Sequence, residues 1–224
     1  MFKHRSNKQE LLDGDVPEKA LITNLKELHI INQFLGGYAI SIKALKQLKL
    51  EKKTLIDIGS GGGDMLNEMY KLSELRKINC RLIGVDLKPE CTAYAKSHLP
   101  QELEFIQDDY RNILDHVDNV DIIHACLFTH HLSNSQIIEL IQFAIKSKST
   151  LVINDLHRNF FAYYSIKLLT SIFSKSYLVK NDAPLSVLRG FKKKEWINLL
   201  EQAGAKKYTV KWKWAFRHLI IVNG

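Results

Sequence analysis

A glycine-rich turn between an apolar run and a helical pattern constrains this sequence more than any other feature. The run 55–58 is followed by Gly59-Ser60-Gly61-Gly62-Gly63-Asp64. Apolar, β-branched residues favour a buried strand, and glycine permits the positive φ angles and close backbone approach of a tight turn. Amides at the start of the following helix face the same space. The pattern therefore predicts a strand, a ligand-binding loop and a helix.

Two acidic residues distinguish this loop from the similar loop of nicotinamide-dependent dehydrogenases. The dinucleotide fingerprint has Gly or Ala three residues after its second glycine, whereas this chain has Asp64 there. Asp57, at the end of the predicted strand, would oppose a pyrophosphate and suits a ligand that carries an ammonium and a sulfonium. These carboxylates disfavour a dehydrogenase.

The rest of the chain alternates between strand-like and helix-like segments. Alternation of this kind predicts an α/β fold with a parallel sheet and right-handed crossovers. A short connection makes the last two strands an antiparallel hairpin. The predicted strands are 55–58, 81–86, 103–106, 120–126, 151–155, 207–214 and 217–222.

The motif Asp57-x-Gly59-x-Gly61-x-Gly63 resembles the cofactor loop of class I S-adenosylmethionine (SAM) methyltransferases. The resemblance covers about residues 50–224. It implies a Rossmann-like, seven-stranded, mostly parallel sheet with an antiparallel C-terminal hairpin strand and helices on both faces. It also implies a SAM-dependent methyltransferase, with SAM as cofactor.

The resemblance also assigns cofactor contacts. Asp86 ends the second strand, at about the distance from the glycine loop at which an acid accepts the ribose hydroxyls. Alternatively, Asp86 caps the helix that follows. Asp108 resembles the acid that binds the adenine amino group, and Asp109 is a second candidate or the cap of a short helix. The predicted cofactor-binding set is Asp57, Gly59, Ser60, Gly61, Gly63, Asp86, Leu87, Asp108, Asp109, Ala125 and Cys126.

Three histidines are candidate catalytic residues because each lies just past a predicted strand. His130 and His131 follow the fourth strand, and His157 follows the fifth. Histidine titrates near neutral pH and can remove the proton of a phenol; a structural role is the alternative for each. Asp155, His157 and His130 could assemble a metal site, but no spacing requires one, so the sequence predicts no metal.

The chain is expected to divide into a lid and a catalytic domain. Residues 1–49 are predicted to form a flexible N-terminal segment and two helices joined at Gly36-Gly37. The helices form either a lid over the cofactor or a layer that simply packs on the sheet edge. Residues 50–224 form the SAM-binding domain, with 157–190 as an acceptor-site insert and 180–184 as a turn. The insert carries two apolar helical stripes. The first has Phe161, Tyr164, Leu168 and Ile172, and the second has Ala162, Ile166, Leu169 and Phe173. One stripe suffices to pack the helix on the sheet, and the remaining apolar surface, with Phe161 and Leu168, is predicted to form a wall of an apolar acceptor site.

The acceptor is expected to be a small apolar or aromatic molecule, methylated on a hydroxyl. The segment after the fourth strand resembles that of small-molecule methyltransferases and lacks the Asp/Asn-Pro-Pro-Tyr pattern of enzymes that methylate exocyclic amines. Segments 25–37 and 154–158 resemble a bacterial branch associated with polyketide or aryl-lipid pathways. An RNA methyltransferase and a SAM-binding protein without catalysis remain the alternatives.

A net charge of +8 and a pI near 9.3 fit either a lysine-rich solvated surface or contact with nucleic acid or an anionic membrane. The dispersed lysines favour the solvated surface. No apolar run reaches the roughly 20 residues of a membrane span, and the basic start lacks the apolar stretch of a signal peptide. Three widely spaced cysteines are typical of the cytoplasm. The sequence makes no prediction of oligomeric state.

Overall fold

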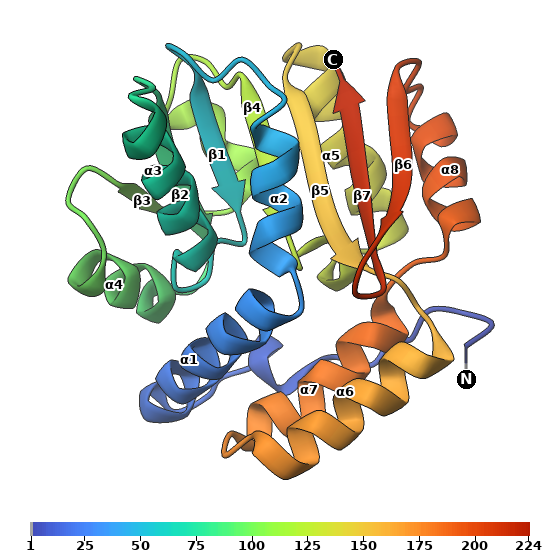
Figure 1. Ribbon diagram of the computed structural model, residues 1–224. Coiled ribbons are helices and arrows are strands. Elements are labelled where there is room, and N and C mark those ends of the chain that lie inside the picture. Colours follow the sequence, from blue (N-terminus) through green and yellow to red (C-terminus); the bar gives the residue numbers. More distant parts are fainter. Residues whose placement is uncertain (1) are drawn as a thin grey trace.

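The computed structural model describes residues 2–224, which fold around one seven-stranded sheet (Figure 1). The strand order is β3-β2-β1-β4-β5-β7-β6; β1 to β5 are parallel, and β7 is antiparallel to both β5 and β6. This confirms the predicted fold. The strands are β1 Thr54–Ile58, β2 Arg81–Asp86, β3 Glu104–Gln107, β4 Ile122–Cys126, β5 Thr150–Leu156, β6 Tyr208–Lys213 and β7 Arg217–Asn223.

Helices cover both faces of the sheet because the strand residues alternate between two apolar cores. Leu55 and Val152 pack with α2 and α3, whereas Ile56 and Ile153 pack with α5 and α8. The helices are α1 Glu18–Phe34, α2 Gly37–Leu45, α3 Asp64–Arg76, α4 Pro89–His98, α5 Asn134–Lys146, α6 Phe160–Phe173, α7 Tyr177–Arg189 and α8 Lys193–Gln202.

Three helices lie beyond the carboxyl ends of the parallel strands. Figure 1 shows α1, α6 and α7 below the arrowheads of β1 and β5. In a parallel α/β sheet this edge is where ligands bind. The two helices predicted ahead of the sheet are present as α1 and α2, and Gly36 between them has a φ of 74°.

The N-terminal segment is packed against α7, although a flexible lead was predicted. The amides of Leu11 and Leu12 both donate to the carboxylate of Asp182 at 2.9 Å. The amide of Ser6 donates to the carbonyl of Leu188 at 3.0 Å. These bonds satisfy polar backbone groups that an unattached segment would leave to water.

The prediction of a turn at 180–184 is wrong. Helix α7 runs through Pro184, and the Ser176 hydroxyl caps its start by accepting from the amide of Val179 at 3.3 Å. A proline inside a helix costs about 3 kcal/mol. Burial of Leu178, Val179 and Leu185 offsets this cost.

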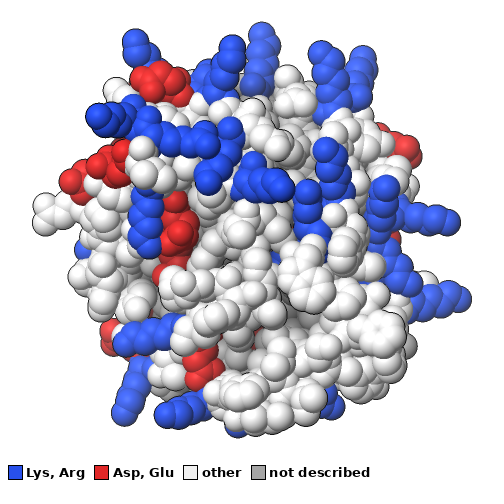
Figure 2. All heavy atoms as spheres, viewed as in Figure 1, with Lys and Arg blue, Asp and Glu red and all other residues white. Residues whose placement is uncertain are grey.

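The stripe of α6 with Phe161, Tyr164, Leu168 and Ile172 faces outward, so these four residues form no wall of an acceptor site. The inner stripe, with Ala162, Ile166 and Leu169, lines the cavity described below. Figure 2 shows the surface over α6, toward the lower right, as mostly uncharged, with Lys and Arg spread above it. Among residues 2–224, no helix is both long and apolar enough to cross a bilayer.

Candidate cofactor and acceptor site

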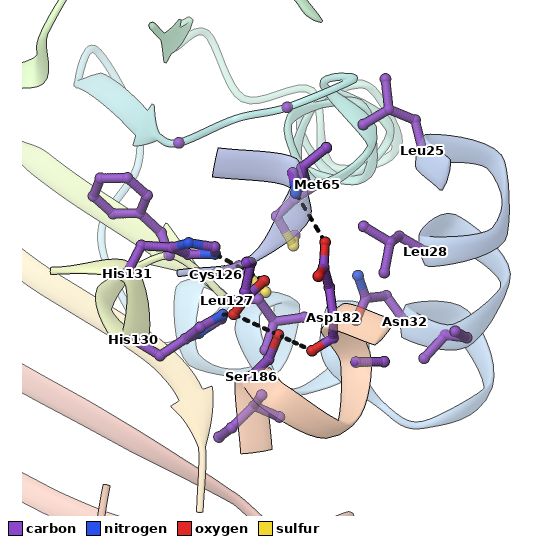
Figure 3. A pocket seen from close by; sticks show the side chains of 18 of the residues that line it. Leu25, Leu28, Asn32, Met65, Cys126, Leu127, His130, His131, Asp182 and Ser186 are labelled. Carbon is purple, nitrogen blue, oxygen red and sulfur yellow. Dashed lines mark hydrogen bonds and ion pairs between the residues drawn. The ribbon is translucent and has the colours of Figure 1, made fainter. Parts of the chain in front are cut away.

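One cavity of about 820 Å³ lies at the carboxyl ends of the strands. It reaches from the glycine loop and Asp86 to His130, and α1, α6 and α7 close it on the other side. Its size falls within the roughly 300–1,000 Å³ of small-molecule sites. In Figure 3, His130 and His131 lie on one side of the cavity, and Leu25 and Leu28 of α1 on the other. The cavity therefore offers room for a cofactor and a second ligand.

The glycine loop has the strained backbone that its sequence predicts. Gly59, Gly61 and Gly63 all have positive φ angles, between 53° and 78°. A Cβ on Gly59 would lie 2.1 Å from Cδ2 of Phe128, so any side chain there would displace the aromatic ring. Gly63 serves packing instead of ligand contact: it does not line the cavity, and its Cβ would collide with Leu99.

Asp86 holds the glycine loop in place. Its carboxylate accepts from the amide of Gly61 at 2.8 Å and from that of Lys88 at 2.9 Å. Burial raises the pKa of Asp86, and these two hydrogen bonds counteract the rise. A carboxylate oxygen accepts more than one hydrogen bond, so Asp86 retains capacity for the predicted ribose hydroxyls.

Asp57 belongs to a buried polar network. Its Oδ1 lies 2.6 Å from Nδ1 of His124. Because a carboxylate can only accept a hydrogen bond, Nδ1 carries the proton and donates. Nε2 of His124 lies 2.9 Å from the hydroxyl of Ser41, to which Asn154 donates at 3.1 Å. These residues replace apolar ones on the α2 face of β1, β4 and β5, so the network joins the cavity floor to α2.

The remaining predicted cofactor residues divide into two groups. Ser60, Leu87, Asp108, Asp109 and Cys126 line the cavity, whereas Ala125 is buried in the sheet core and does not. The alternative role of Asp109 is confirmed, since it caps a short helix by accepting from the amide of Arg111 at 3.0 Å. Asp108 accepts from Nε2 of His116 at 2.7 Å, which lowers the pKa of its carboxyl.

Several buried polar atoms of the cavity wall lack a hydrogen-bond partner within residues 2–224. They are both side-chain polar atoms of Asn24, the hydroxyls of Ser60 and Tyr110, and Nε and Nη1 of Arg217. A buried polar group without a partner costs about 1–3 kcal/mol. A ligand rich in amine, carboxylate and hydroxyl groups would remove this cost, so the lining fits SAM.

His130 and His131 lie at the acceptor end of the cavity, on a short 3₁₀ helix after β4. Nδ1 of His130 donates to Asp155 at 2.7 Å, and Nδ1 of His131 donates to Asp13 at 2.8 Å. Burial acts to raise the pKa of Asp155. The charge and the hydrogen bond of His130 outweigh this effect and hold the pKa well below its usual range. Burial likewise acts to raise the pKa of Asp13, but the hydrogen bond and the charge of His131 outweigh it, and the pKa is lowered to about 2.

Glu10 completes this polar cluster, and no sequence signal identified it. It is buried, accepts from the hydroxyl of Ser186 at 2.9 Å, and lies near both histidines. Burial raises its pKa to about 7, although His131, Ser186 and Arg189 act to lower it. Its partners come from segments more than a hundred residues away in the sequence, so only the fold brings them together.

His157 is placed apart from the cavity, so it does not join His130 and His131 there. Its ring centre lies 4.8 Å from that of His218 on β7. Burial, together with the charges of Lys192 and Arg158, lowers the pKa of His157. This pair is therefore a structural element behind the site.

The His157–His218 pair predicts acid sensitivity. Burial, together with His157 and Lys193, lowers the pKa of His218 to about 4, although Asp155 and Glu195 act to raise it. The unfolded chain, with the ordinary value of about 6.5, takes up this proton first as the pH falls. The free energy of unfolding is thus expected to decrease between about pH 6.5 and 4, by up to about 1.4 kcal/mol per pH unit.

Urea unfolding of the wild type and of His218→Asn at several pH values measures this effect. The variant carries no proton-accepting ring, so its stability should fall less steeply over the same interval. Identical slopes for the two proteins would contradict the prediction. A surface variant, His98→Asn, is expected to keep the wild-type slope because His98 is exposed.

Residues 49–204 match the model of a family described as a methyltransferase domain. This match extends over more than half of the chain. The chain belongs to the methyltransferase domain family. The prediction of a class I, SAM-dependent methyltransferase is thereby confirmed, with SAM as its cofactor. A search of curated protein sequences found no match.

Solved structures show the same fold in other methyltransferases. The plantazolicin methyltransferase BpumL, solved with SAH, is 18% identical with a TM-score of 0.64 over 90% of this chain and 87% of that one. A SAM-dependent methyltransferase from Archaeoglobus fulgidus is 13% identical, with a TM-score of 0.55 over 83% and 92% of the two chains. Human N-acetylserotonin methyltransferase with SAM is 18% identical, with a TM-score of 0.51 over 76% and 47%.

Proposed function

We propose that this methyltransferase transfers the methyl group of SAM to a hydroxyl of a small apolar or aromatic acceptor. The observation that supports this most is the cavity at the carboxyl ends of the strands, in which the glycine loop and an apolar wall share one space. Leu25 and Leu28 of α1 and Ile166 of α6 contribute to that wall. An enclosed apolar wall suits a small molecule better than a polymer strand.

In the proposed reaction, the acceptor oxygen attacks the methyl carbon of SAM in line with sulfur. The new O–C bond forms as the S–C bond breaks, and sulfur keeps the bonding pair and loses its positive charge. The hydroxyl proton leaves for water. SAM supplies the electrophile, so the chain's contribution is to position both reactants and to exclude bulk water.

His130 and His131 are proposed to contact the acceptor hydroxyl. Both lie at the cavity, and Nδ1 of each is engaged by a carboxylate, which leaves Nε2 directed to the ligand space. The predicted cofactor contacts, Asp57 and Asp86 among them, remain proposals of the same kind. So do the division into residues 1–49 and 50–224, the assignment of 157–190 to the acceptor site, the cytoplasmic location, and the association with polyketide or aryl-lipid pathways.

Transfer of a labelled methyl group from SAM tests the acceptor class. Phenols and naphthols should be methylated on oxygen, as judged by mass spectrometry of the products. Bulk RNA is the comparison acceptor. Methylation of RNA that weakens steeply with added salt, without methylation of any phenol or naphthol, would overturn the proposal.

Two adjacent leucines of α6 provide a matched pair of variants. Leu169 lines the cavity, whereas Leu168 faces solvent and is 61% exposed. Leu169→Ser should lower kcat/KM for the methylated phenol by about 5- to 10-fold, the effect of losing roughly 1 kcal/mol of apolar contact. Leu168→Ser should stay within about twofold. SAM affinity, measured by calorimetry, should be unchanged in both.

The opposite ranking of the two variants would place the acceptor against the outer stripe of α6. Equal, large losses in both would instead indicate that the substitutions disturb the helix. Circular dichroism and thermal unfolding separate that case, because a folded α6 variant retains the wild-type transition.

A further inference from the structure

Three side chains at the acceptor end of the cavity converge on one point. Nε2 of His130 lies 3.7 Å from Oε1 of Glu10, and Nε2 of His131 lies 3.9 Å from Oε2 of Glu10. The three donor atoms lie within 4.8 Å of one another. These separations exceed the roughly 2.7–3.2 Å of a hydrogen bond, so direct bonds do not hold the three groups together.

Each histidine is oriented by a carboxylate behind it. Asp155 Oδ1 accepts from Nδ1 of His130, and Asp13 Oδ1 accepts from Nδ1 of His131. A neutral imidazole that donates through Nδ1 carries a lone pair on Nε2. Metal-binding histidines are almost always oriented in this way by a second carboxylate or carbonyl. Both lone pairs are therefore directed toward the carboxylate of Glu10.

The surrounding contacts hold all three side chains near this point. Nε and Nη2 of Arg189 donate to the carbonyls of His130 and His131, both at 3.1 Å. The hydroxyl of Ser186 donates to Glu10. Glu10 and His130 are buried, and His131 is partly exposed to the cavity. Figure 3 shows His130 and Ser186 facing each other across this point.

When both histidines are neutral, as metal binding requires, three carboxylates and two guanidinium groups surround the cluster. The carboxylates belong to Glu10, Asp13 and Asp155, and Arg189 is the nearest cation, with Nε 3.8 Å from Oε1 of Glu10 and Nη1 3.2 Å from Oδ2 of Asp13. The guanidinium of Arg5 donates to the carbonyls of His130 and Leu132, on the backbone side of the histidines. A divalent cation between the histidines and Glu10 would offset the remaining negative charge.

We propose that Glu10, His130 and His131 bind one divalent transition-metal ion, with Zn²⁺ as the representative. Two histidines and one carboxylate form a known ligand set for catalytic zinc, in which a further position stays open for water or substrate. Tetrahedral zinc with bonds of about 2.1 Å holds its ligands about 3.4 Å apart. The site must contract by up to about 1.4 Å from the separations in the structure, which the partly exposed ring of His131 permits.

The proposal deepens the proposed function and rests on it for its chemical consequence. The open position would face the cavity, where the acceptor hydroxyl is proposed to lie. A bound metal ion lowers the pKa of a coordinated hydroxyl and holds its oxygen in place. The acceptor oxygen would then attack as a metal-bound alkoxide or phenoxide, and its proton passes to water.

Metal binding is measured directly on the metal-free full chain, without SAM or acceptor. Co²⁺ serves as the optical probe, and Zn²⁺ displaces it in a competition titration. We expect one Co²⁺ per chain, with visible absorption bands of a low-coordinate site. Glu10→Gln and His131→Gln should each weaken Co²⁺ binding by at least about 100-fold, and Asp13→Asn by about 10- to 100-fold.

Control variants separate this site from other ligands in the chain. His98→Gln removes an exposed histidine and should leave Co²⁺ binding unchanged. Cys126→Ser removes the thiol that lines the same cavity, and it should not alter the visible spectrum. SAM binding by calorimetry and the thermal transition establish that Glu10→Gln and His131→Gln remain folded.

The outcomes distinguish this proposal from the proposed function. Absence of the Co²⁺ bands in the wild type, or equal Co²⁺ affinity in wild type, Glu10→Gln and His131→Gln, would overturn the metal site. Undiminished phenol methylation by the metal-free chain would leave the proposed function standing and overturn the role of the metal in activating the acceptor hydroxyl. Metal binding without methylation of any phenol would overturn the acceptor class alone.

Discussion

Replacing Asp57 with alanine is expected to lower the affinity for SAM by about 100-fold and to destabilise the protein. Asp57 is 2% exposed, lines the cavity, and accepts from Nδ1 of His124 at 2.6 Å. Hydrogen bonds to charged groups contribute about 1.5–3 kcal/mol, and removal of one partner of a buried pair costs about 3–5 kcal/mol. Alanine would leave the N–H of His124 buried without an acceptor and remove the negative charge that faces the cofactor.

Asp57→Asn separates these two effects. Within residues 2–224, only Oδ1 of Asp57 accepts a hydrogen bond from the protein, so an asparagine carbonyl oxygen can replace it and keep the bond to His124. We therefore expect Asp57→Asn to recover much of the lost stability but little of the SAM affinity. Calorimetric titration with SAM and urea unfolding measure the two quantities.

Asp121 provides the matched control for Asp57. It is an acid next to the start of β1, at the other end of the sheet, where it accepts from Nζ of Lys53 and the amide of Thr54. Asp121→Asn should change SAM affinity by less than about twofold. Wild-type SAM affinity in Asp57→Ala would show that the charge of Asp57 does not contribute to cofactor binding.

Local sequence patterns were sufficient to predict the sheet and the cofactor loop. A strand, a turn and a helix in consecutive residues need only short-range contacts, and Gly59 and Gly61 reveal the positive φ angles directly. Alternation of strands and helices then leaves few arrangements for the sheet. The strand order confirms the predicted sheet, and the family match confirms the predicted methyltransferase.

The acceptor end could not be predicted because long-range contacts build it. Glu10, His131 and Ser186 come from three distant segments, and nothing in the residues beside Glu10 indicates its burial. Periodicity gave two apolar stripes on α6 but could not say which one faces the cavity. In the structure Leu169 lines the cavity, although it is 40% exposed, and Leu168 does not line it. Pro184 indicated a turn, yet packing of α7 overrode that local signal.

Replacing Asp155 with alanine is expected to lower the free energy of unfolding by about 3–5 kcal/mol. Asp155 is fully buried and accepts four hydrogen bonds. Oδ2 accepts from the hydroxyl of Thr129 at 2.5 Å and from the amide of His130 at 2.9 Å. Oδ1 accepts from Nδ1 of His130 and from the amide of Leu156, both at 2.7 Å. Alanine leaves all four donors without this acceptor.

Asp155→Asn tests whether the stability depends on the number of hydrogen-bond acceptor sites at this position or only on the charge. Because each carboxylate oxygen already serves two donors, either orientation of an asparagine amide places its NH₂ group against two of them. We therefore expect Asn to rescue little of the lost stability, in contrast to Asp57→Asn. Asp118→Ala, at an exposed acid, should change stability by less than about 0.5 kcal/mol. A stability of Asp155→Asn equal to that of the wild type would show that the donors find other acceptors, and that His130 is not held in position by Asp155.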